Sequence, residues 1–513
     1  MKLRVKLRVS IKNHSICIRF IRAVLVLFTA INTAHASLLA FQGQYGSELE
    51  EQAAISNQRV YDELKALGCT DTQVAATTNC DAGSFRVWNG VRELVHTANE
   101  LNNTVGGPTL FSLDSDLEGL GFALRWTAGE EFSTQESMSD SFVNGQLSGL
   151  SSRVTALTRG MKGFALASNY FPGISQKTLL ASDALWLEEQ KGGGASGDTD
   201  KVLSPWGGFF NTSYTYGDQD ASDFEDAYDF VGYAYSGGVD YRLSPSWVVG
   251  VTMGYSEQDI AFDANKSIVE GTVDMTAYSL MPFLLFQADS LFATVSAGYQ
   301  VAEFETERFI RYPSFNPNVS NTDTIAVSDN DADIVTVTGS VGYSYTPSRF
   351  AMLSIDPYLS INYQRTSIGE YTEQDIKNEG FAFTVDKQNL ESFESVLGLR
   401  VQGVASFGWG VLVPFVDVQF FTEHNTGDHK INAIYADAND SLTDVSQFSL
   451  ETNGTELSYN IYAVGVSAVV RGTTYTTGNG AAGGIQVYFS YRSIENIQDY
   501  TQHILAGGAR YEF

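Results

Sequence analysis

Residues 247–256 read WVVGVTMGYS, and large apolar side chains alternate there with small or polar ones. The apolar set is Trp247, Val249, Val251, Met253 and Tyr255, and the set between them includes Gly250, Thr252, Gly254 and Ser256. A period of two is typical of a β-strand with one apolar face. The same alternation recurs in residues 206–216, 291–300 and 485–492. We therefore expect the chain from Trp206 to its C-terminus to form β-structure.

Strand and loop lengths decide which kind of β-structure this is, because a soluble β-sandwich would also alternate. Each run has about ten residues, the length of a tilted strand that crosses a bilayer. Tight turns at residues 243–246, 288–290 and 346–348 alternate with polar, acidic loops around residues 217–229, 258–270, 305–332, 365–388 and 423–456. Short turns at one end and long loops at the other are the layout of an outer-membrane barrel. We predict an all-β transmembrane barrel of about twelve antiparallel strands.

The predicted strands lie near residues 206–216, 229–241, 247–257, 271–287, 291–304, 333–346, 350–364, 390–405, 409–422, 457–470, 484–493 and 501–513.

The first residues have the features of a secretory signal peptide. A basic stretch runs from Lys2 to Arg22 without an acidic residue, and an apolar run from Ala23 to Ile31 follows it. The small residues after this run end in the sequence AHA at residues 34–36. A basic head, a short apolar segment and an A-x-A site indicate cleavage. We expect residues 1–36 to be removed after Ala36.

Removal of the signal peptide changes the net charge and the number of cysteines of the chain. The sequence has 31 basic and 60 acidic residues. Removal of the signal peptide takes away seven basic residues and no acidic ones, so the processed chain has 24 basic and 60 acidic residues and a formal charge of −36. Such an excess of acid argues against nucleic acid as a partner, because phosphates would be repelled. Cys69 and Cys80 remain, close in sequence and in an oxidising compartment, so we expect a disulfide between them. Two buried thiols are the alternative.

The residues before the barrel have a helical apolar period. Leu49, Ala53, Val60 and Leu64 share one face, and Gly68 is a natural helix end. Similar periods begin at Val87 and Leu147, and a Gly-rich linker occupies residues 191–198. The predicted domains are a small α-helical region at residues 37–138, a linker with a helix at residues 139–205, and the barrel at residues 206–513.

The C-terminal part, from about Ser139 to Phe513, resembles the β-domain of bacterial autotransporters, which are type V secretion proteins. The stretches that carry this resemblance are Trp206–Phe210, Tyr235–Gly254, Gly298-Tyr299 followed by Glu307-Arg308, Val413–Val416 and Gly507–Phe513. The resemblance implies a barrel whose lumen holds one α-helix, here within Ser139–Ala167, and a passenger upstream that reaches the surface of a Gram-negative cell.

The resemblance also implies partners. The end of the chain looks like the signal that the outer-membrane barrel assembly machinery reads, carried by Gly508, Tyr511 and Phe513. A monomeric barrel in contact with outer-membrane lipid and lipopolysaccharide is expected. The departure from the family lies in the passenger, which is commonly a long β-solenoid. Here the region before the helix is short and reads as helical.

Charged residues with the inward strand parity form the candidate lumen lining. They are Asp240, Asp356, Glu394, Arg400, Asp417, Arg492, Arg510 and Glu512. In lipid each charge would cost several kcal/mol (about 2–4 for Arg or Lys at the midplane), which supports an inward direction. These groups can pair with one another and with Arg153 on the inserted helix. Solvation by water in the pore is the alternative.

Motifs for catalysis or for bound cofactors are not found in the sequence. A G-x-S-x-G elbow is absent, and the histidines after the signal peptide are His96, His424, His429 and His503. Glu423, His424, Asp428 and His429 lie in one predicted loop, where a solvated polar loop is favoured over a metal site. We expect no enzyme activity, no cofactor and no metal.

Three functions stay open on the sequence, and the one with least support is a surface enzyme or adhesin in Ser37–Ser137. The favoured one is a translocator barrel in the outer membrane that exports or displays its short helical N-terminal segment. The alternative is a passive pore or structural barrel whose helical N-terminus stays in the periplasm or plugs the lumen.

Overall fold

The computed structural model describes residues 37–103, 107–169, 206–262, 268–350, 352–407, 409–425, 430–438, 440–443, 446–452, 458–470, 485–497 and 499–512. The predicted signal peptide, the Gly-rich linker and Phe513 lie outside the described residues.

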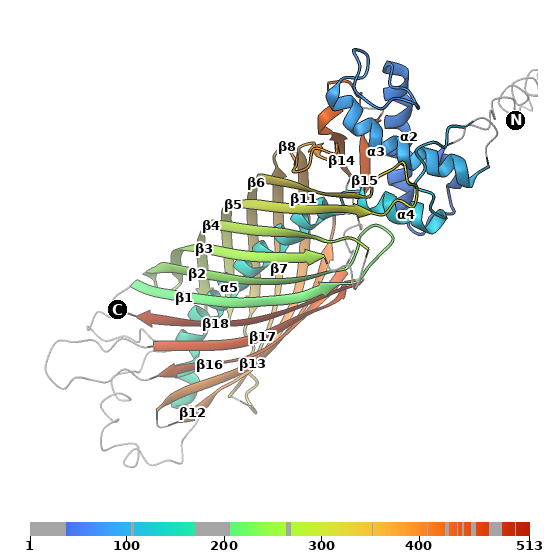
Figure 1. Ribbon diagram of the computed structural model, residues 1–513. Helices are drawn as coiled ribbons and strands as arrows, with labels where there is room; N and C mark the ends of the chain where they lie inside the picture. The colour runs from blue at the N-terminus through green and yellow to red at the C-terminus, as the bar shows by residue number, and fades with distance from the viewer. Residues whose placement is uncertain are drawn as a thin grey trace, which may run out of the picture.

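Twelve long strands form one closed antiparallel barrel, as predicted (Figure 1). They are β1 (Trp206–Gln219), β2 (Tyr228–Ser244), β3 (Trp247–Phe262), β4 (Gly271–Ala288), β5 (Leu291–Tyr312), β6 (Thr322–Tyr343), β7 (Leu353–Ile368), β11 (Gln388–Gly403), β13 (Gly410–Glu423), β16 (Ser458–Val470), β17 (Ile485–Ile497) and β18 (Tyr500–Glu512). The short strand β12 (Ala405–Phe407) extends the sheet beside β13. Each strand pairs with its neighbour in the chain, and β1 pairs with β18 to close the ring. Closure leaves no free strand edge among these twelve, which a bilayer would not tolerate.

The strands are longer toward the long loops than the sequence predicted. Residues 305–332 were expected to form a loop, but β5 and β6 each have 22 residues and leave only residues 313–321 between them. The alternation continues there with inward residues such as Phe304, Arg308 and Ile310 buried. The prediction failed because the outward residues of this stretch are charged, so they do not show the apolar period of a lipid-facing strand.

The outer wall of the barrel carries a band of exposed apolar side chains. Its members include Met253, Leu280, Leu284, Val295, Val337, Leu359, Leu397, Val416, Val464 and Phe489. Exposed aromatic residues border this band, with Trp206, Trp247 and Trp409 near the tight turns and Tyr235, Tyr278 and Tyr299 on the other side. Such a band between aromatic girdles is the surface that faces lipid.

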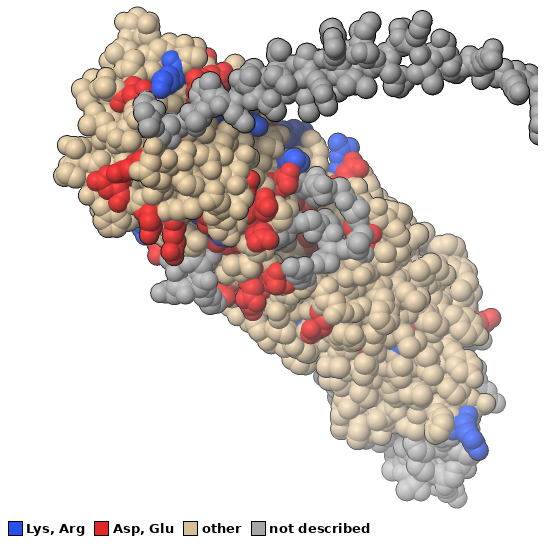
Figure 2. Space-filling model, turned by 90° about the vertical axis from the view of Figure 1, so that its right-hand side faces the viewer, with Lys and Arg blue, Asp and Glu red and all other residues tan. Residues whose placement is uncertain are grey.

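Acidic residues begin where the apolar band ends. Glu303 and Glu305 on β5 are exposed and lie opposite Asp331 and Asp329 on β6. Figure 2 shows one face on which acidic side chains gather at and below the helical end of the molecule, while the barrel wall farther down is largely uncharged. We call the end of the barrel with the tight turns the turn end, and the other the loop end.

The loops at the loop end build a second, four-stranded sheet. Its strands are β8 (Tyr371–Thr372), β10 (Phe383–Val385), β14 (Lys430–Tyr435) and β15 (Phe448–Glu451), in the order β15-β14-β10-β8. Two more short elements belong to these loops, β9 (Gln374–Asp375), which pairs with β6, and the 3-10 helix η3 (Ala436–Ala438). The long loops are therefore folded structure, which their acidic composition did not reveal.

Four α-helices precede the barrel. They are α2 (Glu48–Leu67), α3 (Ala82–Leu101), α4 (Leu117–Trp126) and α5 (Thr134–Asn169), with 3-10 helices η1 (Leu38–Phe41) and η2 (Glu130–Ser133). The side chains of Ser47, Asp81 and Asp116 cap α2, α3 and α4 by accepting a backbone N–H three residues on. Helix α4 has only ten residues, and the sequence analysis did not single it out. None of the described helices combines the length and the hydropathy that a membrane span requires.

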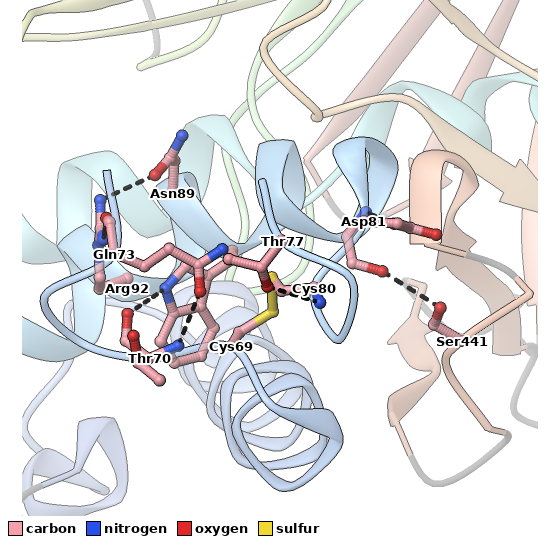
Figure 3. Close-up of a disulfide and its surroundings, with 11 residues drawn as sticks. Cys69, Thr70, Gln73, Thr77, Cys80, Asp81, Asn89, Arg92 and Ser441 are labelled. Atoms are coloured by element: carbon pink, nitrogen blue, oxygen red, sulfur yellow. Dashed lines mark hydrogen bonds between the residues drawn. A yellow bond between two sulfur atoms is a disulfide. The ribbon is translucent and has the colours of Figure 1, made fainter. Parts of the chain in front are cut away.

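Residues 37–133, which we call the helical region, are held together by a disulfide between Cys69 and Cys80 (Figure 3). Both cysteines are buried, and their loop is tied to α3 by side chains of that helix. Arg92 Nη1 donates to the Gln73 carbonyl at 2.6 Å, and Trp88 Nε1 donates to the Thr70 carbonyl at 3.2 Å. The disulfide therefore fixes the loop between α2 and α3 against the core.

Replacing both cysteines, Cys69→Ala with Cys80→Ala, should destabilise the helical region by about 3 kcal/mol, because the loop-closing constraint on the unfolded chain is lost. Proteolysis of this region should have its midpoint at a lower urea concentration than in the unmodified protein. The gel mobility of the folded barrel should be unchanged. Reduction of the unmodified protein should give the same shift. Equal urea midpoints in all three samples would show that the disulfide does not stabilise this region.

Candidate functional site

Helix α5 lies inside the barrel, which confirms the predicted lumen helix (Figure 1). Its apolar residues Leu150, Val154 and Leu157 pack on one side of the lumen. The barrel residues of this cluster are Phe209, Val248, Met281, Phe283 and Leu285. The predicted segment Ser139–Ala167 lies within the 36 residues of α5. A helix with its side chains needs about 10–12 Å, so this lumen is filled by a helix where an eight-stranded barrel is filled by side chains alone.

An ion pair between Arg153 and Asp240 holds α5 to the wall. Both side chains are buried, and the Arg153 guanidinium also lies 4.9 Å from the centre of the Phe209 ring. Gly207 makes room for the pair, because a Cβ at this position would lie 3.2 Å from Nη2 of Arg153. Arg153 is the residue of the inserted helix that the sequence predicts as a partner of the lumen charges. The side chains of Arg159 and Lys162, farther along α5, lie outside the described residues.

Three of the predicted lumen charges form a continuous row across neighbouring strands. Asp356 on β7 lies opposite Arg400 on β11, which lies opposite Asp417 on β13. Arg400 Nε donates to Asp417 Oδ2 at 3.0 Å, and Arg400 also donates to the hydroxyl of Thr155 on α5. The row thus connects the barrel wall to the inserted helix. Next to Asp417 the row reaches Ala463 on β16 and then Arg492 on β17.

The other predicted lumen charges have different surroundings. Glu394 accepts hydrogen bonds from Tyr459 Oη at 2.7 Å and from Asn362 Nδ2 at 3.2 Å. Arg510 is half-buried on β18, and the side chain of Glu512 lies outside the described residues. The predicted lumen residues therefore do not form one cluster.

Helix α5 is off-centre, because it lies nearest to β1 to β5, although single side chains also reach other strands. The space on the far side forms two adjoining cavities, of about 140 Å³ and 450 Å³, which share the side chains of Asn144 and Ile494. The smaller one is lined by Arg400, Arg492 and Asp356, and the larger one, toward the loop end, is lined by several carboxylates. These carboxylates are Glu136, Asp140, Asp223, Glu225, Glu391, Glu394, Glu423 and Asp499.

A buried ion pair at the loop end of the barrel was not expected from the sequence. Arg308 on β5 donates to Glu373 through Nε at 3.0 Å and through Nη2 at 2.6 Å. Arg308 Nη2 also donates to the Phe381 carbonyl at 2.8 Å, and Glu373 accepts the Phe383 N–H at 2.8 Å. The inward direction of Arg308 could have been predicted, because Arg308 continues the alternation that places every second residue of β5 on the inside. Its partner lies 65 residues away in a loop, so the pairing itself could not be read.

The helical region docks on the loop sheet through buried polar contacts. Tyr435 Oη donates to Asn57 Oδ1 at 2.9 Å, and Arg86 forms a bidentate pair with Asp437 at 2.7 and 2.8 Å. Gly83 lies so close that a Cβ there would be 2.0 Å from the Asp437 carbonyl oxygen. The buried apolar residues of the helical region and of the loop sheet form one hydrophobic cluster. The two parts therefore share a core.

Two further polar contacts join the entry of α5 to the barrel. Gln135 and Asn330 exchange amide hydrogen bonds at 3.1 and 3.0 Å, both buried. Arg125 on α4 forms an ion pair with Asp226, and Asp226 Oδ2 accepts the Val269 N–H at 2.9 Å. These contacts fix the chain where it passes from the helical region into the lumen.

Burial shifts the pKa values of two groups on α3. Burial raises the pKa of Glu93 to about 8, and the nearby Glu379 acts in the same direction. Burial lowers the pKa of His96 to about 4, although Asp71 lies 3.5 Å from its Nε2. Both groups are therefore held neutral near pH 7. His96 Nδ1 accepts the Phe111 N–H at 3.1 Å, so this histidine has a structural role.

The loop that had been weighed as a metal site has another role. Glu423 Oε1 accepts three backbone N–H groups, those of Phe393, His424 and Asn425, at 2.7–2.9 Å. Asp428 and His429 lie outside the described residues. Within the described part of the chain, no group of three or more His, Cys, Asp or Glu side chains is arranged to hold a metal ion.

Two of the predicted assembly-signal residues, Gly508 and Tyr511, lie on β18. Gly508 faces Asn211 and Tyr488, and a Cβ there would be 2.4 Å from Asn211 Oδ1. Tyr488 Oη donates to the same oxygen at 3.0 Å, so a small residue at position 508 is needed for this contact. Tyr511 pairs with Gly208 and Ile485 through the backbone, its side chain is not among the described ones, and Phe513 lies outside the described residues.

Comparisons with known proteins agree with this architecture. The family model described as autotransporter beta-domain matches residues 208–482. Similar solved structures include the translocator domain of the autotransporter NalP from Neisseria meningitidis, with 13% identity, a TM-score of 0.43 and coverage of 61% of this chain and 90% of that chain.

Two other solved structures are also similar to this chain. The β domain of the Bordetella autotransporter Brka has 13% identity, a TM-score of 0.35 and coverage of 60% of this chain and 99% of that chain. The transport unit of AIDA-I from Escherichia coli has 10% identity, a TM-score of 0.34 and coverage of 62% and 93%. No curated protein matches the chain.

The substitution Arg153→Met should destabilise the folded barrel by about 3–5 kcal/mol, because it leaves the buried Asp240 carboxylate without its cation. The measurement is the temperature at which the folded gel band is lost. The double variant Arg153→Met with Asp240→Asn is the matched control and should recover most of the loss. If the single and double variants melt alike, the ion pair does not hold α5.

The raised pKa of Glu93 predicts that the helical region becomes less stable as the pH rises from 6.5 to 8. The unfolded state releases this proton near pH 4.5 and the folded state near pH 8, so the folded state binds more protons in between. The substitution Glu93→Gln should remove about 1–2 kcal/mol of this loss, measured by urea-dependent proteolysis at both pH values. Glu48→Gln, at an exposed position, is the control and should keep the slope of the unmodified protein. An unchanged slope in Glu93→Gln would refute the assignment.

Proposed function

The chain belongs to the autotransporter β-domain family, and on that premise we propose that this outer-membrane barrel exports and displays its own short helical N-terminal region. The family model covers residues 208–482, which is more than half of the chain. Proteins of this family are typically transporters, and we propose the same role here in place of catalysis. The proposed units are a signal peptide (residues 1–36), a helical passenger (37–138), a linker with the lumen helix (139–205) and the barrel (206–513).

The single observation that carries the proposal is the path of the chain through the barrel. Strand β1 begins at the turn end, because Trp206 lies opposite Tyr241 near the turn between β2 and β3. Helix α5 enters at the loop end, where Ser141 accepts a hydrogen bond from Gln502, and Arg153 meets Asp240 farther toward the turn end. In outer-membrane barrels the short turns face the periplasm and the long loops face the outside. A chain on this path has its N-terminal region on the outside.

The docking contacts support display of a region that stays bound to the barrel. The helical region and the loop sheet share one hydrophobic cluster, which neither could bury alone. Arg86 with Asp437 and Tyr435 with Asn57 add specific contacts at this interface. We therefore propose that the exported segment caps the barrel from which it emerged.

The alternative of a passive pore receives less support. The lumen is occupied by α5, and the helical region lies at the end opposite to the one expected to face the periplasm. A plug that entered from the periplasm would have its folded part beside the tight turns.

The partners follow from the surfaces. Outer-membrane lipid would cover the apolar band, and lipopolysaccharide would lie at its loop-end border. The assembly machinery would read the end of β18, with Gly508, Tyr511 and Phe513 as the proposed signal. Closure of the ring through β1 and β18 leaves these edges paired, which favours a monomeric barrel.

Protease treatment of intact cells tests the display. An epitope tag next to Ser47 should be lost from intact cells, because the helical region would lie outside. The matched control is the same tag in the linker at residues 191–198, which should survive until the outer membrane is permeabilised. Survival of the Ser47 tag in intact cells, with loss only after permeabilisation, would contradict display.

A further inference from the structure

The row of lumen charges has one position at which the pairing stops. Along neighbouring strands the register places Asp356, Arg400, Asp417, Ala463 and Arg492 side by side. Acidic and basic residues alternate in the first three, and Arg400 is hydrogen-bonded to Asp417. An acid at position 463 would continue the row, but alanine occupies it. Arg492 therefore has no acidic neighbour at the adjoining position of β16.

The guanidinium of Arg492 is buried and, within the described part of the chain, feels the charge of Asp417 without forming a direct hydrogen bond or ion pair with it. The residue is 8% exposed, and the described residues offer it neither a hydrogen bond nor an ion pair. A buried charge without a partner is unfavourable by several kcal/mol in proteins. Arg492 is thus unlike Arg153, Arg308 and Arg400, each of which is bonded to a carboxylate.

The side chain of Arg492 lines the smaller lumen cavity beside α5, together with Arg400 and the carboxylate of Asp356. This cavity has a volume of about 140 Å³, enough for a small polyatomic ion with water. Hydroxyl groups of α5 line the same cavity, those of Ser148, Ser151 and Thr155. A planar guanidinium matches carboxylate and phosphate oxygens in a bidentate manner, and hydroxyls can donate to the remaining oxygens.

We propose that this cavity is an oxyanion site, in which Arg492 binds a small free anion of the phosphate type against the hydroxyl face of α5. The anion takes the place in the charge row that Ala463 leaves empty. It contacts both the barrel wall and the inserted helix, so its binding stabilises the helix in the lumen. The carboxylates of the larger cavity disfavour the entry of anions from the loop side.

The test uses the full mature chain refolded in detergent micelles, in sodium phosphate or in sodium chloride of equal ionic strength. Refolding in each salt lets the anion enter before α5 is fixed. Phosphate should raise the temperature at which the folded gel band is lost by about 2–4 °C at saturation.

Three variants test whether the effect of phosphate on the melting temperature depends on Arg492. Arg492→Met should abolish the phosphate effect, while Arg365→Gln, an exposed position on the outer wall, should retain it. Ala463→Asp should raise the melting temperature in chloride and remove the dependence on phosphate, because the chain then supplies the missing acid. The proposal is overturned if phosphate and chloride give the same melting temperature for the unmodified protein. It is also overturned if Arg492→Met keeps the full phosphate effect.

Discussion

A backbone that crosses hydrocarbon must satisfy its own hydrogen bonds, and this constraint closes the twelve strands into a ring. Closing twelve strands creates a lumen that side chains from the wall alone do not fill. Helix α5 occupies this space, with its apolar face on β1, β3 and β4 and with Arg153 bonded to Asp240. The direction in which α5 passes through the ring then decides on which side of the barrel the helical region lies. The placement of the exported segment is thus a consequence of how the lumen is filled.

Much of this architecture was readable from the sequence because its physical causes are periodic. A period of two along Trp247–Phe262 and its neighbours predicted the strands, and the inward phase of Asp240 and Asp417 followed from the same count. The disulfide followed from two cysteines close in sequence. A helical apolar period from Leu147 onward, together with the family resemblance, located the lumen helix.

What the sequence did not reveal depends on contacts between distant segments. The inward residues in the extension of β5 and β6 pack against the helical region and the loops. The outward face of the extension carries Glu305 and Asp329 in place of apolar residues. The loop sheet consists of strands of two to six residues, too short to show a period. Arg308 and Glu373 are joined only by the fold. The lack of an acidic residue at position 463, between Asp417 and Arg492, could be recognised only once the register of β13, β16 and β17 was known.

The central claim is that α5 fills the lumen of the folded barrel, and single-channel conductance in planar bilayers tests it most directly. The comparison is between the full mature chain and the barrel alone, residues 206–513, both refolded in the same detergent. The account predicts a low conductance for the full chain and a several-fold higher one for the barrel alone, because removal of the helix opens the cross-section that it occupies. Equal conductance of the two proteins would place α5 outside the lumen and contradict the account.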